Sequence, residues 1–285
     1  MSGRTFIRSG LSGLLKRPLV AAAGSYLRAR GERRADAAAV TAIGKPVPGP
    51  DLIWRATGAR SPRWFLESGE RSVGEMDAVL ARAGSRLDSH DRILDFGCGC
   101  GRVLLWLDGL APETELIGTD VDREAVEWAR THIPYAQLLV NQPLPPLALP
   151  DGAVDLVINH SVFTHLDETF QDAWLAELRR LTRPDALVLL TVHGEHAWER
   201  SISGWKGENL SGVERYERRW RDHGFVFVEN ADEWEGAFPD FYHSAFHAPW
   251  YLESHWSRFF IVEEHAARAS LDFQDYVLLR RPRDE

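Results

Sequence analysis

The chain has 285 residues, of which 44% are hydrophobic, and it carries a formal net charge of −9. This length and composition predict a globular protein with one large or two small domains. The acidic balance argues against a general nucleic-acid binder, which usually presents a basic face. The sequence has no apolar run long enough to span a membrane and no compact secretory signal. Two cysteines build no disulfide framework, so we expect a cytoplasmic protein.

The first 34 residues differ in charge from the rest of the chain. They hold eight cations against Glu32 alone, a net charge of +7, which leaves −16 for the remainder. Apolar residues recur there at helical spacing, namely Ile7, Leu11, Leu14, Leu15 and Leu19. One interpretation is a basic amphipathic helix that makes peripheral contact with an anionic membrane surface. The other, favoured by the interspersed glycines, is an arm or helix packed on the main domain.

A Gly/Pro-rich patch at residues 44–50 is the clearest break in the chain. Three parts are expected in chain order: a basic N-terminal arm (1–50), a helical lid or linker (51–89) and a main domain (90–285). Within the lid or linker, apolar spacing predicts a helix from about Val73 to Ala83.

From residue 92 onward, apolar strand-like runs alternate with helical patterns. Five strands are expected, at Ile93–Phe96, Leu116–Thr119, Gln137–Val140, Val154–Asn159 and Ala186–Val192. Helices are expected to begin at Arg102 and Arg123, and a third holds Phe170 to Leu181. Two more strand-like runs close the chain, at Arg258–Val262 and Phe273–Leu279. This alternation predicts an α/β fold, a parallel sheet with right-handed crossovers and helices on both faces.

The most informative stretch is the glycine loop after the first expected strand. Its pattern is Gly97-x-Gly99-x-Gly101, with Asp95 just before it. Glycines let the backbone turn sharply and approach a ligand, so the order strand, loop, helix predicts a nucleotide cradle. The dinucleotide fingerprint would place its third glycine where this chain has Arg102, which disfavours an NAD-dependent oxidoreductase.

With its leading acid, this loop resembles the first motif of class I S-adenosylmethionine-dependent methyltransferases. The run from Asp151 to Leu166 resembles the fourth strand and following loop of bacterial members, particularly those associated with polysaccharides and secondary metabolites. The resemblance implies a seven-stranded, mostly parallel Rossmann-like sheet with an N-terminal helical segment. It also implies that residues 195–255, inserted after strand five, form a cap over the acceptor site.

The resemblance further implies S-adenosylmethionine as the cofactor. Asp120, at the tip of the second strand, is expected to bind the ribose hydroxyls, whereas Asp122 suits a helix N-cap. Asn141 is expected near the adenine amino group, and a turn role is its alternative. The other cofactor-binding candidates are Asp95, Gly97, Cys98, Gly99, Gly101, Val121 and Asn159. The spacing of the two cysteines cannot supply a four-ligand metal site, so no metal is expected.

Methyl transfer to a hydroxyl requires alignment of the reactants and a proton acceptor, for which histidine is the natural side chain. The catalytic candidates are His160, His193 and His243, and the substrate-binding candidates are His165, Tyr242 and His247. A local structural role is the alternative for each of them. The tryptophans between residues 193 and 256 could stack on an acceptor or form the core of the cap.

The expected reaction is O-methylation of a sugar, glycan or small-metabolite hydroxyl by direct in-line transfer. The alternatives are N-methylation of a small amine, S-adenosylmethionine binding without catalysis and, less favoured, NAD-dependent oxidoreduction. A nucleic-acid partner is not expected, because residues 159–162 read Asn-His-Ser-Val rather than Asn/Asp-Pro-Pro-aromatic. The identity of the acceptor and the oligomeric state stay open.

Overall fold

The computed structural model describes residues 40–110, 112–208, 212–229 and 239–283. The chain divides into two compact units, residues 1–44 and 45–285. In the first unit, residues 40–43 form a helical turn, and the basic segment 1–34 lies outside the described residues. None of the helices in the described ranges has the length and apolar composition that a membrane crossing requires.

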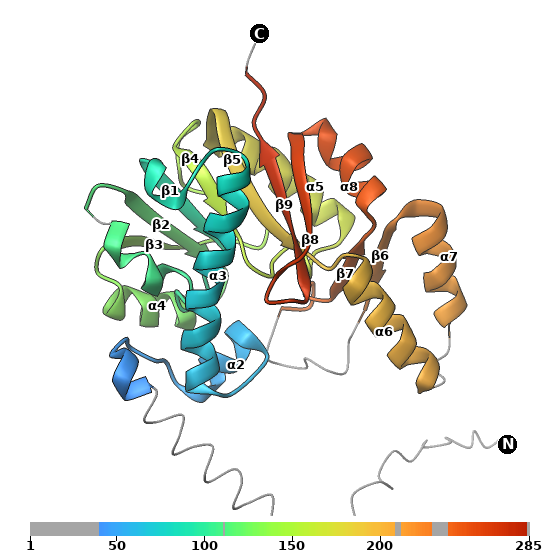
Figure 1. Cartoon of the computed structure of the whole chain (residues 1–285), viewed down its shortest axis with the longest axis horizontal. Coiled ribbons are helices and arrows are strands. Elements are labelled where there is room, and N and C mark those ends of the chain that lie inside the picture. The colour runs from blue at the N-terminus through green and yellow to red at the C-terminus, as the bar shows by residue number, and fades with distance from the viewer. Residues whose placement is uncertain (1–39, 111, 209–211, 230–238, 284–285) are drawn as a thin grey trace, which may run out of the picture. The chain divides into compact units, whose positions relative to one another are not determined.

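Seven strands of the second unit form one sheet, in the order β3-β2-β1-β4-β5-β9-β8 (Figure 1). The strands are β1 (Arg92–Phe96), β2 (Glu115–Asp120), β3 (Ala136–Val140), β4 (Val154–Ile158), β5 (Thr182–Val192), β8 (Ile261–Ser270) and β9 (Gln274–Arg280). β1 to β5 pair in parallel, whereas β9 is antiparallel to both β5 and β8. The predicted seven-stranded, mostly parallel sheet with a terminal strand pair is confirmed.

Helices cover both faces of this sheet, as expected for parallel strands that are buried throughout. In Figure 1, α3 lies in front of the sheet and α5 behind it. The helices are α2 (Pro50–Thr57), α3 (Pro62–Arg82), α4 (Arg123–His132), α5 (Glu168–Leu181), α6 (Glu195–Gly207), α7 (Val213–His223) and α8 (Pro249–His255). Asp122 accepts a hydrogen bond from the Ala125 amide at 3.1 Å and caps α4, the role that the sequence predicted for it.

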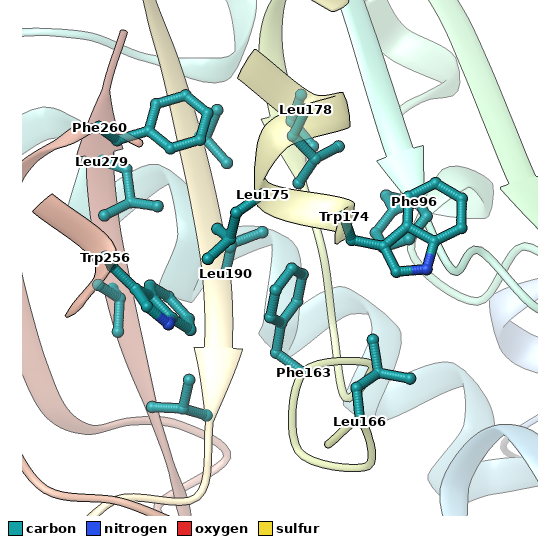
Figure 2. Packing of buried hydrophobic residues seen from close by; sticks show 14 of the residues in the cluster. Phe96, Phe163, Leu166, Trp174, Leu175, Leu178, Leu190, Trp256, Phe260 and Leu279 are labelled. Carbon is teal, nitrogen blue, oxygen red and sulfur yellow. The ribbon is translucent and has the colours of Figure 1, made fainter. Parts of the chain in front are cut away.

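An aromatic core fixes the ends of β1 and β4 relative to α5 (Figure 2). Phe96, the last residue of β1, packs on Trp174 of α5 with 4.5 Å between the ring centroids. Phe163, in the loop after β4, meets the fully buried Trp256 at 5.4 Å. Because both phenylalanines lie next to segments that the sequence assigned to the site, this core holds those segments in place.

One helix prediction was wrong, and a second gave the right helix but the wrong start. The helix expected from Arg102 is instead a pair of short 3-10 turns, Leu104–Trp106 and Asp108–Leu110. Gly109 lies within the second turn and Pro112 follows it, and neither residue supports continuation of a helix. α3 begins at Pro62, not near Val73, because Ser61 caps it and its first half packs on the first of the two turns, where Gly69 lies against Trp106.

The segment from 195 to 255 contains more regular structure than the sequence indicated. It contributes α6, α7, α8 and a two-stranded antiparallel sheet of β6 (Phe225–Val228) and β7 (Ser244–His247). Trp198 and Trp220 stack there with 4.9 Å between their centroids, within a small apolar cluster. For these two tryptophans the core interpretation is confirmed.

We predict that Gly97→Ala destabilises the fold by about 2 to 4 kcal/mol, through backbone strain and overpacking. Gly97 has a φ of 79°, and a Cβ there would overlap Val162 Cγ2. Chemical denaturation of the full chain measures the effect. Gly109→Ala is the matched control, since a Cβ at Gly109 meets no atom within 4 Å. Equal stability of the two variants would contradict the prediction.

Candidate functional site

A cavity of about 740 Å³ lies at the carboxyl ends of the parallel strands. Its wall includes the glycine loop after β1, the ends of β2 and β3, and the loop after β4. α2 and α3 contribute Trp54 and Trp64, and the segment before β7 contributes Tyr242. The crevice outside the carboxyl ends of parallel strands is where α/β folds bind ligands.

The three glycines of the loop have different roles. All have positive φ, with values of 79° at Gly97, 54° at Gly99 and 78° at Gly101. A Cβ at Gly97 or Gly101 would overlap a core side chain, Val162 or Ile133 respectively. At Gly99 a Cβ would meet nothing within 4 Å. Gly99 is therefore the position where the loop backbone is open to a ligand.

Asp120 ties the tip of β2 to the glycine loop. Its Oδ2 accepts a hydrogen bond from the Gly99 amide at 2.7 Å, and its Oδ1 accepts one from the Asp122 amide at 2.8 Å. Burial raises the pKa of the Asp120 carboxyl to about 6. The predicted ribose-binding acid is thus placed in the cavity wall, with one further lone pair on each oxygen.

The two candidate asparagines differ. Asn141 lines the cavity, donates from Nδ2 to the Gln142 carbonyl at 2.8 Å, and leaves its Oδ1 without a partner among the described residues. Asn159 is fully buried, is not part of the cavity wall, and donates from Nδ2 to the Phe96 carbonyl at 2.5 Å. The expectation that Asn159 contacts the cofactor is therefore not supported, because its amide holds the end of β1. Cys98 and Val121 do line the cavity.

The structure brings some of the predicted histidines together and separates others. His160, His165 and His193 line the cavity with Tyr242. His243 is not part of the wall, and its ring packs against Phe227. This placement gives no support to the prediction that His243 is catalytic.

His247, predicted to bind substrate, also lies outside the cavity wall. It is fully buried and shares a hydrogen bond of 2.9 Å with the Gln171 side chain. Its ring packs against Trp256 in the aromatic core, with 5.8 Å between centroids. His247 thus lies in the core, where its Nε2 contacts Gln171 and its Nδ1 has no hydrogen-bond partner among the described residues.

His165 is the best oriented histidine of the cavity. Its Nδ1 lies 2.7 Å from the His243 carbonyl, so Nδ1 carries the proton and Nε2 the lone pair. Tyr242 stacks on its ring at 3.9 Å. Burial lowers the pKa of His165 to about 3 and that of His193 to about 4, and lowers that of His160 well below its usual value. All three side chains are consequently neutral at physiological pH.

Asp95 and Arg102 place two opposite charges in the same wall. Asp95 is 2% exposed, and its carboxylate accepts no hydrogen bond from any described residue. Burial raises the pKa of Asp95 to about 7, while the charge of Arg102 opposes this rise. Arg102 is 6% exposed and forms no ion pair within the described part of the chain. A ligand with both a cationic and an anionic group would suit such a wall.

Arg102 and the α2–α3 residues were missed as site residues in the sequence analysis. Arg102 directly follows the last loop glycine, so a cation at that position was the available signal. The α2–α3 segment offered no comparable signal, because Trp54 and Trp64 enter the cavity wall only through tertiary packing. Arg55 of α2 ties this segment to the start of α4 through Asp122 at 2.9 Å and Glu124 at 2.6 Å.

Comparison with known proteins identifies the central segment. Residues 93–185 match the family model described as a methyltransferase domain. An uncharacterized methyltransferase of Schizosaccharomyces pombe is 32% identical over 108 residues, which are 34% of this chain and 38% of that protein. A malonyl-[acyl-carrier protein] O-methyltransferase of Hahella chejuensis is 30% identical over 129 residues, or 45% of this chain and 44% of that protein. The chain thus spans less than half the length of either relative.

The fold has a counterpart among solved structures. Magnesium protoporphyrin IX methyltransferase from Synechocystis, solved with bound S-adenosylhomocysteine, superposes with a TM-score of 0.52. The match covers 77% of this chain and 86% of that one, at 14% identity, and so concerns the fold alone. Residues 93–185 of the chain are therefore similar to a methyltransferase domain, and the order of the strands in its sheet is that of the class I fold.

Proposed function

We propose that the chain is an S-adenosylmethionine-dependent methyltransferase that works in the 740 Å³ cavity. The observation that carries this proposal is the unpartnered, buried carboxylate of Asp95 beside the open backbone of Gly99. A buried carboxylate without a partner is costly unless a ligand supplies a cationic donor. S-adenosylmethionine carries such a donor in the ammonium group of its methionine end.

The remaining cofactor roles follow from the chemistry of the wall. The free lone pairs of Asp120 suit the two ribose hydroxyls, and the Asn141 Oδ1 suits the amino group of adenine. Gly99 allows the ligand to approach the backbone closely. The cofactor, when bound, supplies an electrophilic methyl group, and the chain must align an acceptor with it and exclude water.

We further propose oxygen as the methylated atom, in a hydroxyl of a sugar, glycan or small metabolite. Three neutral histidines line the cavity, and neutral imidazole can accept the proton that a hydroxyl loses. A hydroxyl becomes strongly acidic as its oxygen takes up the methyl group, so a histidine of low pKa suffices. The Hahella relative is named a malonyl-[acyl-carrier protein] O-methyltransferase, which supports oxygen as the methylated atom but does not bear on the choice of a hydroxyl.

Two other functions remain candidates for test. One is methylation of a small amine, and the other is S-adenosylmethionine binding without catalysis. Formation of S-adenosylhomocysteine with hydroxyl acceptors but not amines would exclude both. A peripheral membrane role of residues 1–34 stays a prediction, which liposome sedimentation with and without residues 1–50 addresses.

The primary test is calorimetric titration of the full chain with S-adenosylmethionine and with NAD. We expect S-adenosylmethionine to bind and Asp120→Ala to weaken its binding by about 2 to 4 kcal/mol, because two hydroxyls lose a charged acceptor. Asp108→Ala is the control, since Asp108 pairs with Lys45 outside the cavity wall. Binding of NAD alone would overturn the proposal, and unchanged affinity in Asp120→Ala would remove Asp120 from the site.

The raised pKa of Asp95 leads to a second prediction, on how S-adenosylmethionine binding depends on pH. With its pKa raised to about 7, part of the free protein carries a protonated Asp95 at neutral pH. The ammonium of the cofactor stabilises the carboxylate, so binding should release a proton and become about five-fold tighter from pH 6 to pH 7. Titrations in buffers with different ionisation enthalpies measure the release. Asp95→Asn should weaken binding and reduce the release, and an unchanged release would contradict this role.

His165 gives a third prediction, on proton transfer. His165→Asn keeps a donor for the His243 carbonyl but removes the Nε2 lone pair. We expect turnover with a hydroxyl acceptor to fall by about 10² to 10⁴, the range typical of a lost general base, with unchanged S-adenosylhomocysteine affinity. Because the pKa of His165 is about 3, wild-type turnover at saturating cofactor should stay flat from pH 5 to pH 8. His132→Gln, on the exposed side of α4, is the control. Equal turnover of the wild type and His165→Asn would exclude His165 as the base.

A further inference from the structure

Arg102 is a buried cation whose hydrogen-bonding capacity is only partly used. Its Nη1 donates to Ser68 Oγ at 3.1 Å and to Ser72 Oγ at 3.3 Å, both on α3. Its Nε and Nη2 have no hydrogen-bond partner among the described residues. One edge of the planar guanidinium is therefore left with parallel N–H donors, the geometry that binds a carboxylate through both oxygens.

The acids around Arg102 do not neutralise it directly. Glu75 accepts hydrogen bonds from the Arg71 side chain and from the Leu271 amide. Asp95 attracts Arg102 through space, yet the two form no ion pair within 4 Å. Burial lowers the pKa of Arg102, but a guanidinium stays protonated. Keeping such a charge out of water is costly unless an anion joins it.

Arg102 is one of the residues that line the cavity. Burial and, second to it, the charge of Arg102 lower the pKa of His160, which lies two residues after the end of β4. His160 Nδ1 lies 3.5 Å from Ser270 Oγ at the end of β8. An anion paired with Arg102 would therefore lie on the β4 and β8 side of the cavity. Nearby Asp95 disfavours an anion with two charges and favours a single carboxylate on a ligand that also carries a cation or is otherwise neutral.

We propose that Arg102 is the carboxylate-binding residue of this cavity. The inference rests on the proposed function, because it names the ligand group that the methyltransferase site holds there. Two ligands can supply that group: the methionine end of the cofactor, or an acceptor that bears an acid beside its hydroxyl. A guanidinium-bound carboxylate is a poor nucleophile, so it serves as an anchor and leaves the hydroxyl as the methylated group.

The first arm of the test asks whether the cofactor supplies the carboxylate that Arg102 binds. The full chain is titrated with S-adenosylmethionine, decarboxylated S-adenosylmethionine, S-adenosylhomocysteine and methylthioadenosine. If the cofactor supplies the carboxylate, the wild type binds S-adenosylmethionine about 10- to 100-fold more tightly than the decarboxylated form. Arg102→Met then weakens S-adenosylhomocysteine by a similar factor and leaves methylthioadenosine unchanged. Arg280→Met, which removes a cation paired with Glu263 outside the wall, changes neither.

The second arm asks whether the acceptor supplies the carboxylate that Arg102 binds. The probes are benzoate and benzamide, which differ only in the acid group, and each is titrated into the S-adenosylhomocysteine complex. If the acceptor supplies the carboxylate, benzoate binds the wild type at least about ten-fold more tightly than benzamide, and Arg102→Met abolishes the difference. Arg102→Lys should retain part of it, because charge remains while the planar fork is lost.

Wild-type measurements keep the proposal falsifiable even if Arg102→Met does not fold. Equal affinity for S-adenosylmethionine and its decarboxylated form, together with equal affinity for benzoate and benzamide, would overturn it. Failure of the proposed function is a different result: no adenosyl ligand would bind the wild type at all. In that case benzoate and benzamide titrated into the free protein still report on Arg102.

Discussion

The site depends on one constraint, the attachment of the glycine loop to the end of β2. The Thr119 carbonyl accepts hydrogen bonds from the Gly97 and Cys98 amides at 2.8 and 2.9 Å, and the Asp120 carboxylate accepts one from Gly99. These bonds hold three consecutive amides against the neighbouring strand. The loop must then turn with positive φ, which only glycine adopts without strain. The floor of the cavity is thus fixed by backbone bonds before any ligand enters.

Burial of polar groups around this floor has two different consequences. For the histidines it removes charge, and neutral imidazoles remain as proton acceptors. For Asp95 it raises the pKa of the carboxyl to about 7, whereas Arg102 stays protonated, and the carboxylate and the guanidinium attract each other without forming a contact pair. A direct ion pair would have satisfied both groups and left nothing for a ligand. Because the two groups are separated, each remains a buried polar group without a charged contact partner, which is unfavourable in free energy. A ligand that bears both a cation and an anion can offset this free energy.

The sequence predicted those features that depend on local chemistry. The positions of the parallel strands followed from the alternation of apolar runs, and the cap at Asp122 and the wall position of Asp120 followed from their places beside strand ends. The histidines around β7 were not predictable in this way. Strand side chains alternate between faces, so His247 enters the core while Ser244 faces the cavity, and no local pattern fixes which face is which. Similarly, the early start of α3 depends on its packing against the 3-10 turn Leu104–Trp106.

The segment just before β7, which includes Tyr242 and His243, is hydrogen-bonded to the loop after β4. Main-chain hydrogen bonds join His243 to His165 at 3.1 Å and Ala245 to Thr164 at 2.8 Å. The same segment places Tyr242 in the wall and provides the carbonyl that fixes the tautomer of His165. A change in this segment that alters acceptor shape would therefore also move the proton acceptor. If the proposed roles hold, acceptor choice and proton removal depend on the same segment, whereas the glycine loop and Asp120 belong to the cofactor side of the cavity.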